Sequence, residues 1–251
     1  MASNRMLRGS VDWEADVLGA QSSATNGLTI GRCNYVLGTG TNTVTAPAVA
    51  GGVIRLTGDT NEAADVLLTG PRAYQINRCG LVTLRARVRL NTSLTGGAFS
   101  IGMQDIVTTG QISYENGSVV STPADGFVLL YEQEQSASQY YTLGVGNDVD
   151  DTARITTNAD TLVLATFVTV LIEADSTNGS NGNDTGVVRY RVHVDGKLLT
   201  TATTDARGFT TSACRSTVVL APVIGRYGRA TANTLDVAEF RCNGMIGTAL
   251  D

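Results

Sequence analysis

Residues 81–90 read LVTLRARVRL, with apolar side chains at every second position from Val82 to Leu90. This two-residue period is typical of a β-strand with one buried face. The opposite face carries arginines at alternate positions, and like charges this close repel unless acidic groups lie across from them. The row therefore either pairs with acidic residues of a neighbouring strand or forms a charged docking face between subunits, and the sequence leaves both open. Its members are Arg85, Arg87 and Arg89.

Further segments rich in β-branched and aromatic residues follow at short intervals, and no helical period is long enough to cross over a parallel sheet. The sequence thus predicts an all-β fold, an antiparallel β-sandwich of the jelly-roll type. Residues 97–105 are expected to pair with residues 81–90, and residues 126–135 with residues 139–147. The other expected strands are residues 51–58, 64–70, 161–175, 187–194, 214–228 and 234–244.

Residues 189–199, RYRVHVDGKLL, predict a β-hairpin. Asp195-Gly196 suits a type I′ turn, whose two central residues both need positive φ. His193, the single histidine of the chain, falls on the polar face of the first strand beside Arg191. An imidazole can act as a general base, but no nucleophile or substrate-orienting group is recognisable around it. We therefore interpret His193 as a surface residue of the hairpin.

The composition limits the classes of protein to which this chain can belong. Its 251 residues include 28 glycines and only 16% charged residues, which is typical of many strands joined by tight turns. The net charge of −5 argues against a nucleic-acid partner, because proteins that bind phosphate backbones display basic surfaces. No apolar run is long enough to span a membrane, and residues 1–16 lack the apolar block of a secretory signal. We expect synthesis in the cytoplasm and no membrane partner.

Segments in a fixed order carry a resemblance to a known family: LVTLRARVRL with FSIGMQD, then DGFVLLYEQ, then FVTVLIEAD, and finally YRVHVDGKLL. An apolar strand that ends in an acidic residue and precedes a V-D-G-K hairpin resembles the concanavalin A-like (laminin-G-like) jelly roll. More narrowly, the segments resemble virion proteins of tailed bacteriophages that carry this sandwich, including capsid decoration proteins and fibre domains. The resemblance covers about residues 50–245.

The resemblance implies a non-enzymatic structural protein of a bacteriophage particle, made in the host cytoplasm and located in the virion. We expect a capsid decoration (cement) protein that bridges coat subunits, with capsid or other virion subunits and further copies of itself as partners. A carbohydrate-binding or receptor-binding module is the first alternative, with Tyr131, Tyr140 and Tyr141 as candidate glycan contacts. A polysaccharide-cleaving enzyme is the next.

An enzyme of this fold would need paired carboxylates. Glu173 and Asp175 share one face of a strand, and Glu132 and Glu134 form a similar pair. Retaining glycosidases hold two carboxyl groups ~5–5.5 Å apart, and glycosidases of this fold continue the ladder with a further acidic residue. Both pairs stop at two, and Arg191 stands where lyases of the fold have the glutamine of a Gln-x-His motif. We therefore expect no catalytic residue.

Metal and cofactor sites have weak support in the sequence. Asp148, Asp150 and Asp151 would be the calcium ligands of an oxygen-rich segment, but the segment does not match the EF-hand loop and suits ordinary turns. The cysteines lack the clustered pairs of a zinc site, and we expect reduced, buried thiols, with a Cys33–Cys242 disulfide as the alternative. We expect no metal and no cofactor. The cysteines are Cys33, Cys79, Cys214 and Cys242.

The first thirty residues differ from the rest of the chain. Residues 1–30 have weak periodicity and no clean strand, so we interpret them as an N-terminal arm. Trp13 and Leu18 are its candidate anchors against a neighbouring subunit, because a segment without a core of its own must bury surface elsewhere to become ordered. The β-sandwich domain would then span residues 31–251.

Overall fold

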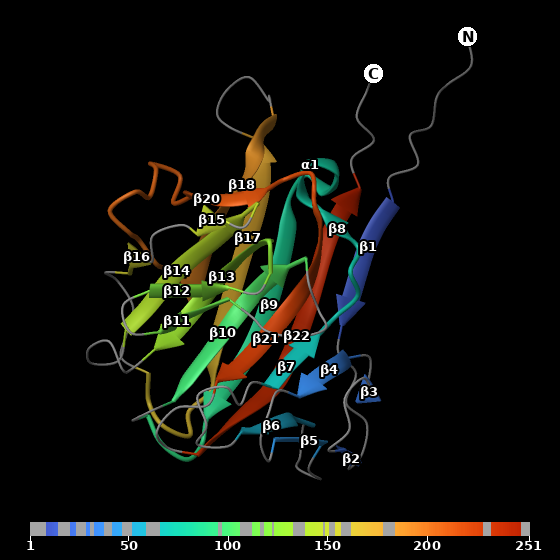
Figure 1. The fold of residues 1–251 in the computed structure, drawn as a ribbon, viewed down its shortest axis with the longest axis vertical. Helices are drawn as coiled ribbons and strands as arrows, with labels where there is room; N and C mark the ends of the chain where they lie inside the picture. Colours follow the sequence, from blue (N-terminus) through green and yellow to red (C-terminus); the bar gives the residue numbers. More distant parts are fainter. Residues whose placement is uncertain are drawn as a thin grey trace.

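The structure is a computed structural model, in which two β-sheets face each other and enclose the main hydrophobic core (Figure 1). The strand pairs of both sheets are antiparallel, which confirms the β-sandwich expected from the sequence. The described residues are 9–14, 21–23, 29–30, 33–37, 42–46, 52–58, 66–94, 97–105, 112–115, 118–121, 123–132, 139–147, 149–150, 154–156, 162–177, 184–227 and 232–246.

One sheet, called sheet A, contains the strand formed by the arginine-bearing segment. Its strands run in the order β19-β18-β17-β9-β22-β6-β5-β2, while β1 pairs with β22 and β20 pairs with β18 beside that path. The bounds are β1 Gly9–Glu14, β2 Gln21–Ser23, β5 Thr43–Ala46, β6 Ile54–Gly58, β9 Val82–Leu90, β17 Val168–Thr177, β18 Asp184–Val194, β19 Lys197–Leu198, β20 Thr210–Arg215 and β22 Asn233–Ile246.

The facing sheet, called sheet B, runs in the order β15-β14-β13-β10-β21-β7-β4-β3, with β16 beside β14 and β8 beside β21. A separate hairpin, β11 and β12, and one short helix, α1, complete the described elements. The bounds are β3 Thr29–Ile30, β4 Cys33–Leu37, β7 Val66–Thr69, β8 Tyr74–Gln75, α1 Ile76–Cys79, β10 Ala98–Gln104, β11 Ile112–Glu115, β12 Ser118–Ser121, β13 Asp125–Glu132, β14 Gln139–Gly146, β15 Val149–Asp150, β16 Arg154–Ile155 and β21 Val219–Tyr227.

Strand β9 lies inside sheet A, between β17 and β22, and its alternation is as the sequence predicts. The apolar residues from Val82 to Leu90 are buried in the core between the sheets, and Thr83 and the arginines point to the other side. The apolar residues of β17, from Val168 to Ala174, alternate in the same way. The polar residues of these neighbouring strands therefore form one continuous outer face of sheet A. All four cysteines are buried and unbridged.

The expected pairing of residues 97–105 with residues 81–90 is wrong. Strand β10 lies in sheet B, where it pairs with β13 and β21. The reason is the burial of the two strands. Every residue of β10 is buried, whereas every second residue of β9 is at least partly exposed. A strand buried on both faces belongs in the covered sheet. The expected pairing of residues 126–135 with residues 139–147 is confirmed by β13 and β14.

The apolar run over residues 161–175 is only partly a strand. A turn interrupts it, with Ala165 at a φ of 57° and the Thr166 amide donating to the Val163 carbonyl at 3.2 Å. Val163 is consequently 59% exposed, and regular pairing begins at Val168. Sequence periodicity could not separate the turn from the strand that begins at Val168, because both parts of residues 161–175 are rich in apolar residues.

Part of the predicted N-terminal arm pairs with the sandwich. Strand β1 lies along β22 from Gly9, opposite Ile246, to Glu14, opposite Arg241. Strand β6 pairs with the other end of the same edge of β22, from Asn233 to Val237. The 14 residues of β22 can therefore pair with both β1 and β6 along one edge. The expectation that residues 1–30 hold no strand is therefore wrong at β1, β2 and β3. Their division from residues 31–251 as a separate domain stays a prediction.

The outer face of sheet B carries a second apolar cluster instead of a polar surface. Ile112 of β11 packs with Val128 and Leu130 of β13 and with Tyr141 of β14. The Tyr227 hydroxyl donates to the carbonyl oxygen of Ile112, which ties β11 to β21. Figure 1 shows β11 and β12 over this sheet. Consequently sheet A, rather than sheet B, presents the polar outer face on which a site can form.

Candidate functional site

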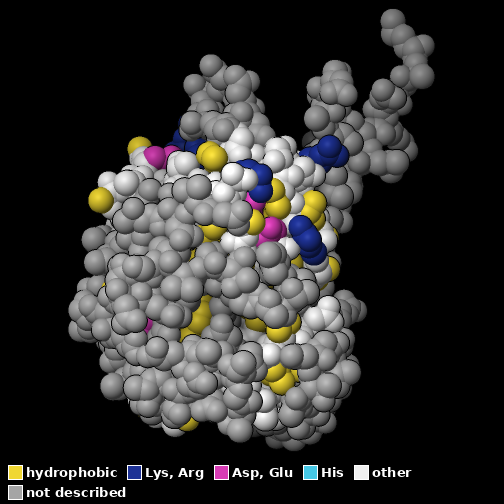
Figure 2. Space-filling model, viewed as in Figure 1, with side chains coloured by type: hydrophobic (Ala, Val, Ile, Leu, Met, Phe, Trp, Pro, Cys, Tyr) yellow, Lys and Arg dark blue, Asp and Glu magenta, His cyan; other side chains and the backbone are white. Residues whose placement is uncertain are grey.

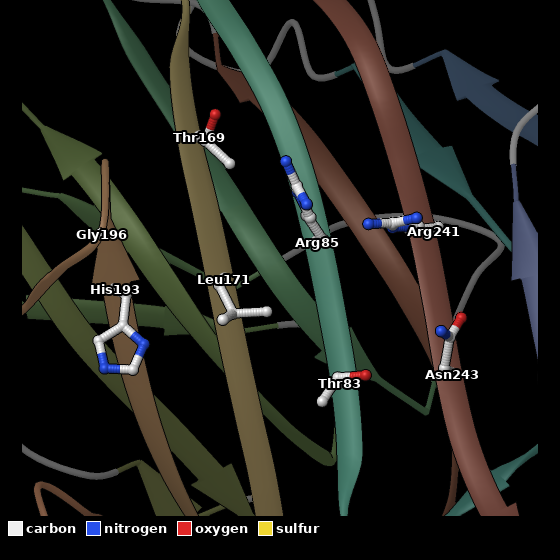
Figure 3. Close-up of a pocket in the computed structure, with 8 residues that line it drawn as sticks. All are labelled: Thr83, Arg85, Thr169, Leu171, His193, Gly196, Arg241 and Asn243. Carbon is white, nitrogen blue, oxygen red and sulfur yellow. The ribbon is translucent and has the colours of Figure 1, made fainter.

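A pocket of about 560 Å³ opens on the outer face of sheet A (Figure 3). Its lining comes from β9, β17, β18 and β22 and from the turn after β18. Among the described residues, the lining is rich in hydrogen-bond donors and contains no carboxylate. The residues are Thr83, Arg85, Thr169, Leu171, His193, Gly196, Arg241 and Asn243.

The register of the strands brings these side chains into rows. Leu171 is opposite His193 on one side and opposite Arg85 on the other, and Arg85 is opposite Arg241. His193, Leu171, Arg85 and Arg241 therefore form one row across β18, β17, β9 and β22. Asn243 and Thr83 are register partners in the adjacent row. Figure 3 shows Leu171 between His193 and Arg85, with the guanidinium of Arg241 directed toward β9.

A single carboxylate holds the two arginines of the pocket. Oε1 of Glu239 lies 3.3 Å from Nε of Arg85 and 3.0 Å from Nε of Arg241. The arginine side chains remain 43% and 39% exposed, so both guanidinium groups stay accessible from solvent. Glu239 is the described carboxylate between the two arginines, and Glu14 of β1 is the register partner of Arg241 on the neighbouring strand.

The other side of the pocket is closed by His193. Its Nδ1 lies 3.8 Å from Oε2 of Glu173, and that same oxygen accepts a 2.7 Å hydrogen bond from Nε of Arg191. Its side chain is 22% exposed. The expected position of His193 on the polar face, beside Arg191, is correct. Its place in the wall of a pocket could not be predicted, because the other wall comes from strands far away in the sequence.

The hairpin after β18 fixes the upper edge of the pocket. Asp195 and Gly196 have φ angles of 48° and 81°, which confirms the positive φ pair expected of a type I′ turn. Asp195 is joined to β17 twice: its amide donates to the Thr169 carbonyl, and its Oδ1 accepts from the Thr169 amide, each at 2.8 Å. Gly196 and Thr169 are thereby held side by side in the lining.

The three arginines of β9 have separate roles. Arg89 binds Oδ2 of the buried Asp236 through Nη2 at 2.9 Å, and Arg87 lies over the ring of Phe167 at 4.7 Å from its centroid. Arg85 alone enters the pocket. For Arg85 and Arg89 the structure shows the first of the two accounts, pairing with acidic residues of the neighbouring strand β22. A docking role for Arg85, Arg87 and Arg89 stays a prediction.

The carboxylates considered for catalysis are engaged in ion pairs. Glu173 is held by Arg191, as described above, and Oδ1 of Asp175 binds Nη2 of Arg189 at 2.8 Å. Glu132 is buried in sheet B, away from the outer face of sheet A, and Glu134 lies outside the described residues. The described carboxylates therefore offer no open acid–base pair.

The candidate glycan contacts Tyr131, Tyr140 and Tyr141 are not on the surface. All three are buried, Tyr131 and Tyr140 in the main core and Tyr141 in the second cluster. The sequence does not reveal this burial, because sheet B is covered on its outer face and both faces of β13 and β14 are mostly apolar. An exposed aromatic platform at these positions is therefore excluded.

Several expected positions fall on residues that the structure describes only in part. Trp13 lies in β1 opposite Cys242, and nothing further is described of its side chain, while Leu18 lies outside the described residues. The side chains of Asp148, Asp150 and Asp151 lie outside them as well. Over the described part of the chain, no three His, Cys, Asp or Glu side chains gather as metal ligands would. Within the same residues, no helix has the length and apolar character needed to cross a membrane.

No protein-family model and no curated protein sequence matches the chain. Among solved structures, peanut lectin with a nine-residue peptide is similar at a TM-score of 0.59 and 12% identity, over 96% of this chain and 100% of the lectin chain. A protein of unknown function from Shewanella oneidensis MR-1 is similar at 0.55 and 13%, over 96% and 90%. An alginate lyase from Chlorella virus is similar at 0.50 and 12%, over 85% and 93%.

At these identities the likeness shows the fold alone. The chain has the concanavalin A-like, lectin-type β-sandwich, as the resemblance in the sequence implies. None of the three neighbours is described as a component of a bacteriophage particle, so the virion part of the resemblance stays a prediction.

Proposed function

We propose that this protein is a non-catalytic carbohydrate-binding β-sandwich that holds its ligand in the outer-face pocket of sheet A. The observation that carries the proposal is the row of His193, Leu171, Arg85 and Arg241, which crosses neighbouring strands and lines one pocket. Strands lie ~4.8 Å apart, so three intervals give a row of roughly 14 Å. An elongated ligand suits such a row better than a small ion does.

The lining has the chemistry that a polyol requires. The hydroxyls of Thr83 and Thr169 and the amide of Asn243 can each donate and accept hydrogen bonds. Leu171 provides an apolar surface in the middle of the row, against which the C–H face of a sugar ring can pack. Since these side chains rise from paired strands, they are held in place before the ligand arrives, which lowers the cost of ordering on binding.

The fold supports the proposal by analogy, because one neighbour is a lectin and another is an alginate lyase. Binding is a better reading than cleavage for two reasons. No carboxylate is among the described lining residues, and the carboxylates considered for catalysis, Glu173 and Asp175, are held by Arg191 and Arg189. A glycoside hydrolase would need a free pair of carboxyl groups at the ligand, and Arg191 stands where lyases of this fold have the glutamine of their Gln-x-His motif.

The sequence-based hypothesis of a capsid decoration protein concerns where such a module acts, and a saccharide site is compatible with it. Co-sedimentation of the purified chain with empty capsids tests that hypothesis. A chain that stays in the supernatant would remove the decoration role and leave the pocket proposal standing.

The proposed function is tested by screening the full chain against a glycan array and titrating the best glycan by calorimetry. Thr83→Ala and Asn243→Ala, which each remove polar groups from the lining, should weaken binding several-fold, and the double variant about tenfold. Thr57→Ala is the matched control, because Thr57 lies on β6 of the same sheet outside the pocket lining. The absence of binding to any glycan, or equal losses in the pocket and control variants, would contradict the proposal.

A further inference from the structure

The arginine side of the pocket gives information on the ligand that the fold does not. Arg85 and Arg241 stand opposite each other on β9 and β22, and both line the pocket. Figure 3 shows Arg85 and Arg241 on neighbouring strands, with Thr83 and Asn243 further along the same two strands. Two like charges at directly opposed positions of a sheet repel, so a ligand that brings a negative charge between them adds to the compensation that Glu239 provides.

The charged side chains of the described pocket lining, Arg85 and Arg241, are both positive. Glu239 is the described carboxylate that contacts the two arginines, and it supplies one negative charge for both. Glu173, on the histidine side, is engaged by Arg191 at 2.7 Å. The chain as a whole carries −5, and on the face shown in Figure 2 acidic and basic side chains lie next to one another. The described lining of the pocket is therefore cationic, and Glu14 of β1, the register partner of Arg241, borders it along the sheet.

The guanidinium groups keep donors for a ligand. A guanidinium has five N–H donors, and the closest approach of Glu239 to each group is through Nε. One carboxylate oxygen cannot occupy the donors of two such groups, and both side chains are accessible from solvent. Planar guanidinium forks match the geometry of carboxylates and sulfates, to which they bind in a bidentate manner.

We infer that the ligand of the pocket is an acidic saccharide, whose carboxylate or sulfate group lies against Arg85 and Arg241 while its ring lies over Leu171. This inference rests on the proposed function and adds the chemical class of the ligand. Arg87 follows Arg85 by two positions in β9, points to the same face, and does not line the pocket. Arg87 therefore marks the boundary of the anion-binding part of the pocket and provides a matched control.

The test compares acidic glycans with neutral forms of the same glycans. The probes are oligogalacturonate and its fully methyl-esterified form, a sulfated oligosaccharide and its desulfated form, and inorganic sulfate, each titrated by calorimetry into the full chain. At least one acidic glycan should bind, its neutral form should bind about tenfold or more weakly, and salt should weaken the acidic form. Arg85→Gln and Arg241→Gln should each weaken the acidic form by about tenfold or more, while Arg87→Gln should not.

The outcomes separate the two proposals. A glycan that binds equally in its acidic and neutral forms, and equally to wild type and Arg241→Gln, would overturn the acidic class and leave the carbohydrate site intact. Failure of every glycan, with or without binding of inorganic sulfate, would overturn the proposed function and the inference together. Arg85→Lys and Arg241→Lys keep the positive charge but lose the bidentate guanidinium group, so these variants should bind the acidic glycan with intermediate affinity. Thermal melts of all variants show whether a loss of binding reflects a loss of folding.

Discussion

Arg85 and Arg241 are register partners on β9 and β22, and the Nε atoms of both lie within 3.3 Å of the same oxygen of Glu239. Opposed residues in an antiparallel pair have Cβ atoms ~4.5–5.5 Å apart, a distance at which two cations destabilise the sheet. The shared carboxylate compensates for this repulsion.

The first prediction concerns that carboxylate. Glu239→Gln should lower the free energy of unfolding by roughly 0.5–1 kcal/mol at low ionic strength, because it leaves two opposed arginines without their counter-ion. The deficit should shrink in 1 M salt, where charges more than ~3 Å apart are screened. Chemical denaturation at both salt concentrations measures it. A deficit that is the same at both would show that Glu239 stabilises through packing and not through charge.

The second prediction concerns His193, which the sequence alone indicates to be a surface residue of the hairpin without a functional role. Because its imidazole lines the pocket, His193→Ala should weaken saccharide binding about three- to tenfold, the value of one hydrogen bond. Stability should change little, since the side chain is outside the core. Lys197→Ala, on the return strand of the same hairpin and outside the pocket lining, is the control. Unchanged affinity in His193→Ala would remove the residue from the site.

How far the sequence predicts this molecule is clear from β9 and the hairpin after β18. Alternation assigned the core residues of β9 correctly, because a strand in a half-exposed sheet must separate apolar from polar side chains. Asp195-Gly196 predicted its turn, because few residues adopt positive φ at two successive positions. Thr83, Arg85 and His193 were thus all expected on an outer surface.

The pocket itself could not be predicted, because it depends on which strands are neighbours. Leu171 meets His193 through a hairpin, but it meets Arg85 and Arg241 through strand order in the sheet, which no local pattern encodes. The tyrosine candidates failed for a related reason. A covered sheet is apolar on both faces, so alternation in β13 and β14 gives no indication of an outer side.

The third prediction concerns acid stability. Burial by itself raises the pKa of Asp236, but hydrogen bonds from Arg55 and Arg89 outweigh it and hold the pKa below its usual range. A carboxylate with a lowered folded-state pKa stabilises the fold above its unfolded-state pKa of ~3.9, and this stabilisation is lost as the pH falls through the folded-state value.

Asp236→Asn should accordingly cost about 2–3 kcal/mol at pH 7, because it leaves two arginines facing a neutral buried group. The difference from wild type should narrow below about pH 4, where the wild-type carboxylate takes up its proton. Arg55→Gln should cost less, since Arg89 still binds the carboxylate. Denaturation curves from pH 2.5 to 7 measure both variants, and a difference independent of pH would contradict the account.

The fourth prediction concerns β1. Deleting residues 1–14 removes the strand that pairs with β22 from Arg241 to Ile246, beside the pocket. The deletion should lower the melting temperature by several degrees, because backbone groups of β22 lose their partners, and it should weaken saccharide binding by loosening Arg241 and Asn243. Unchanged melting and unchanged binding would instead support residues 1–30 as an arm that acts outside the sandwich.

The most direct test of the central claim is to locate the saccharide on the protein. In ¹H–¹⁵N NMR spectra of the full chain, titration with the best acidic glycan should shift the side-chain Nε–H signals of Arg85 and Arg241 and the side-chain amide of Asn243. The Nε–H signal of Arg87, which lies over Phe167, should stay in place. Shifts confined to residues of sheet B or its loops, with Arg85, Arg241 and Asn243 unmoved, would contradict a saccharide site on the outer face of sheet A.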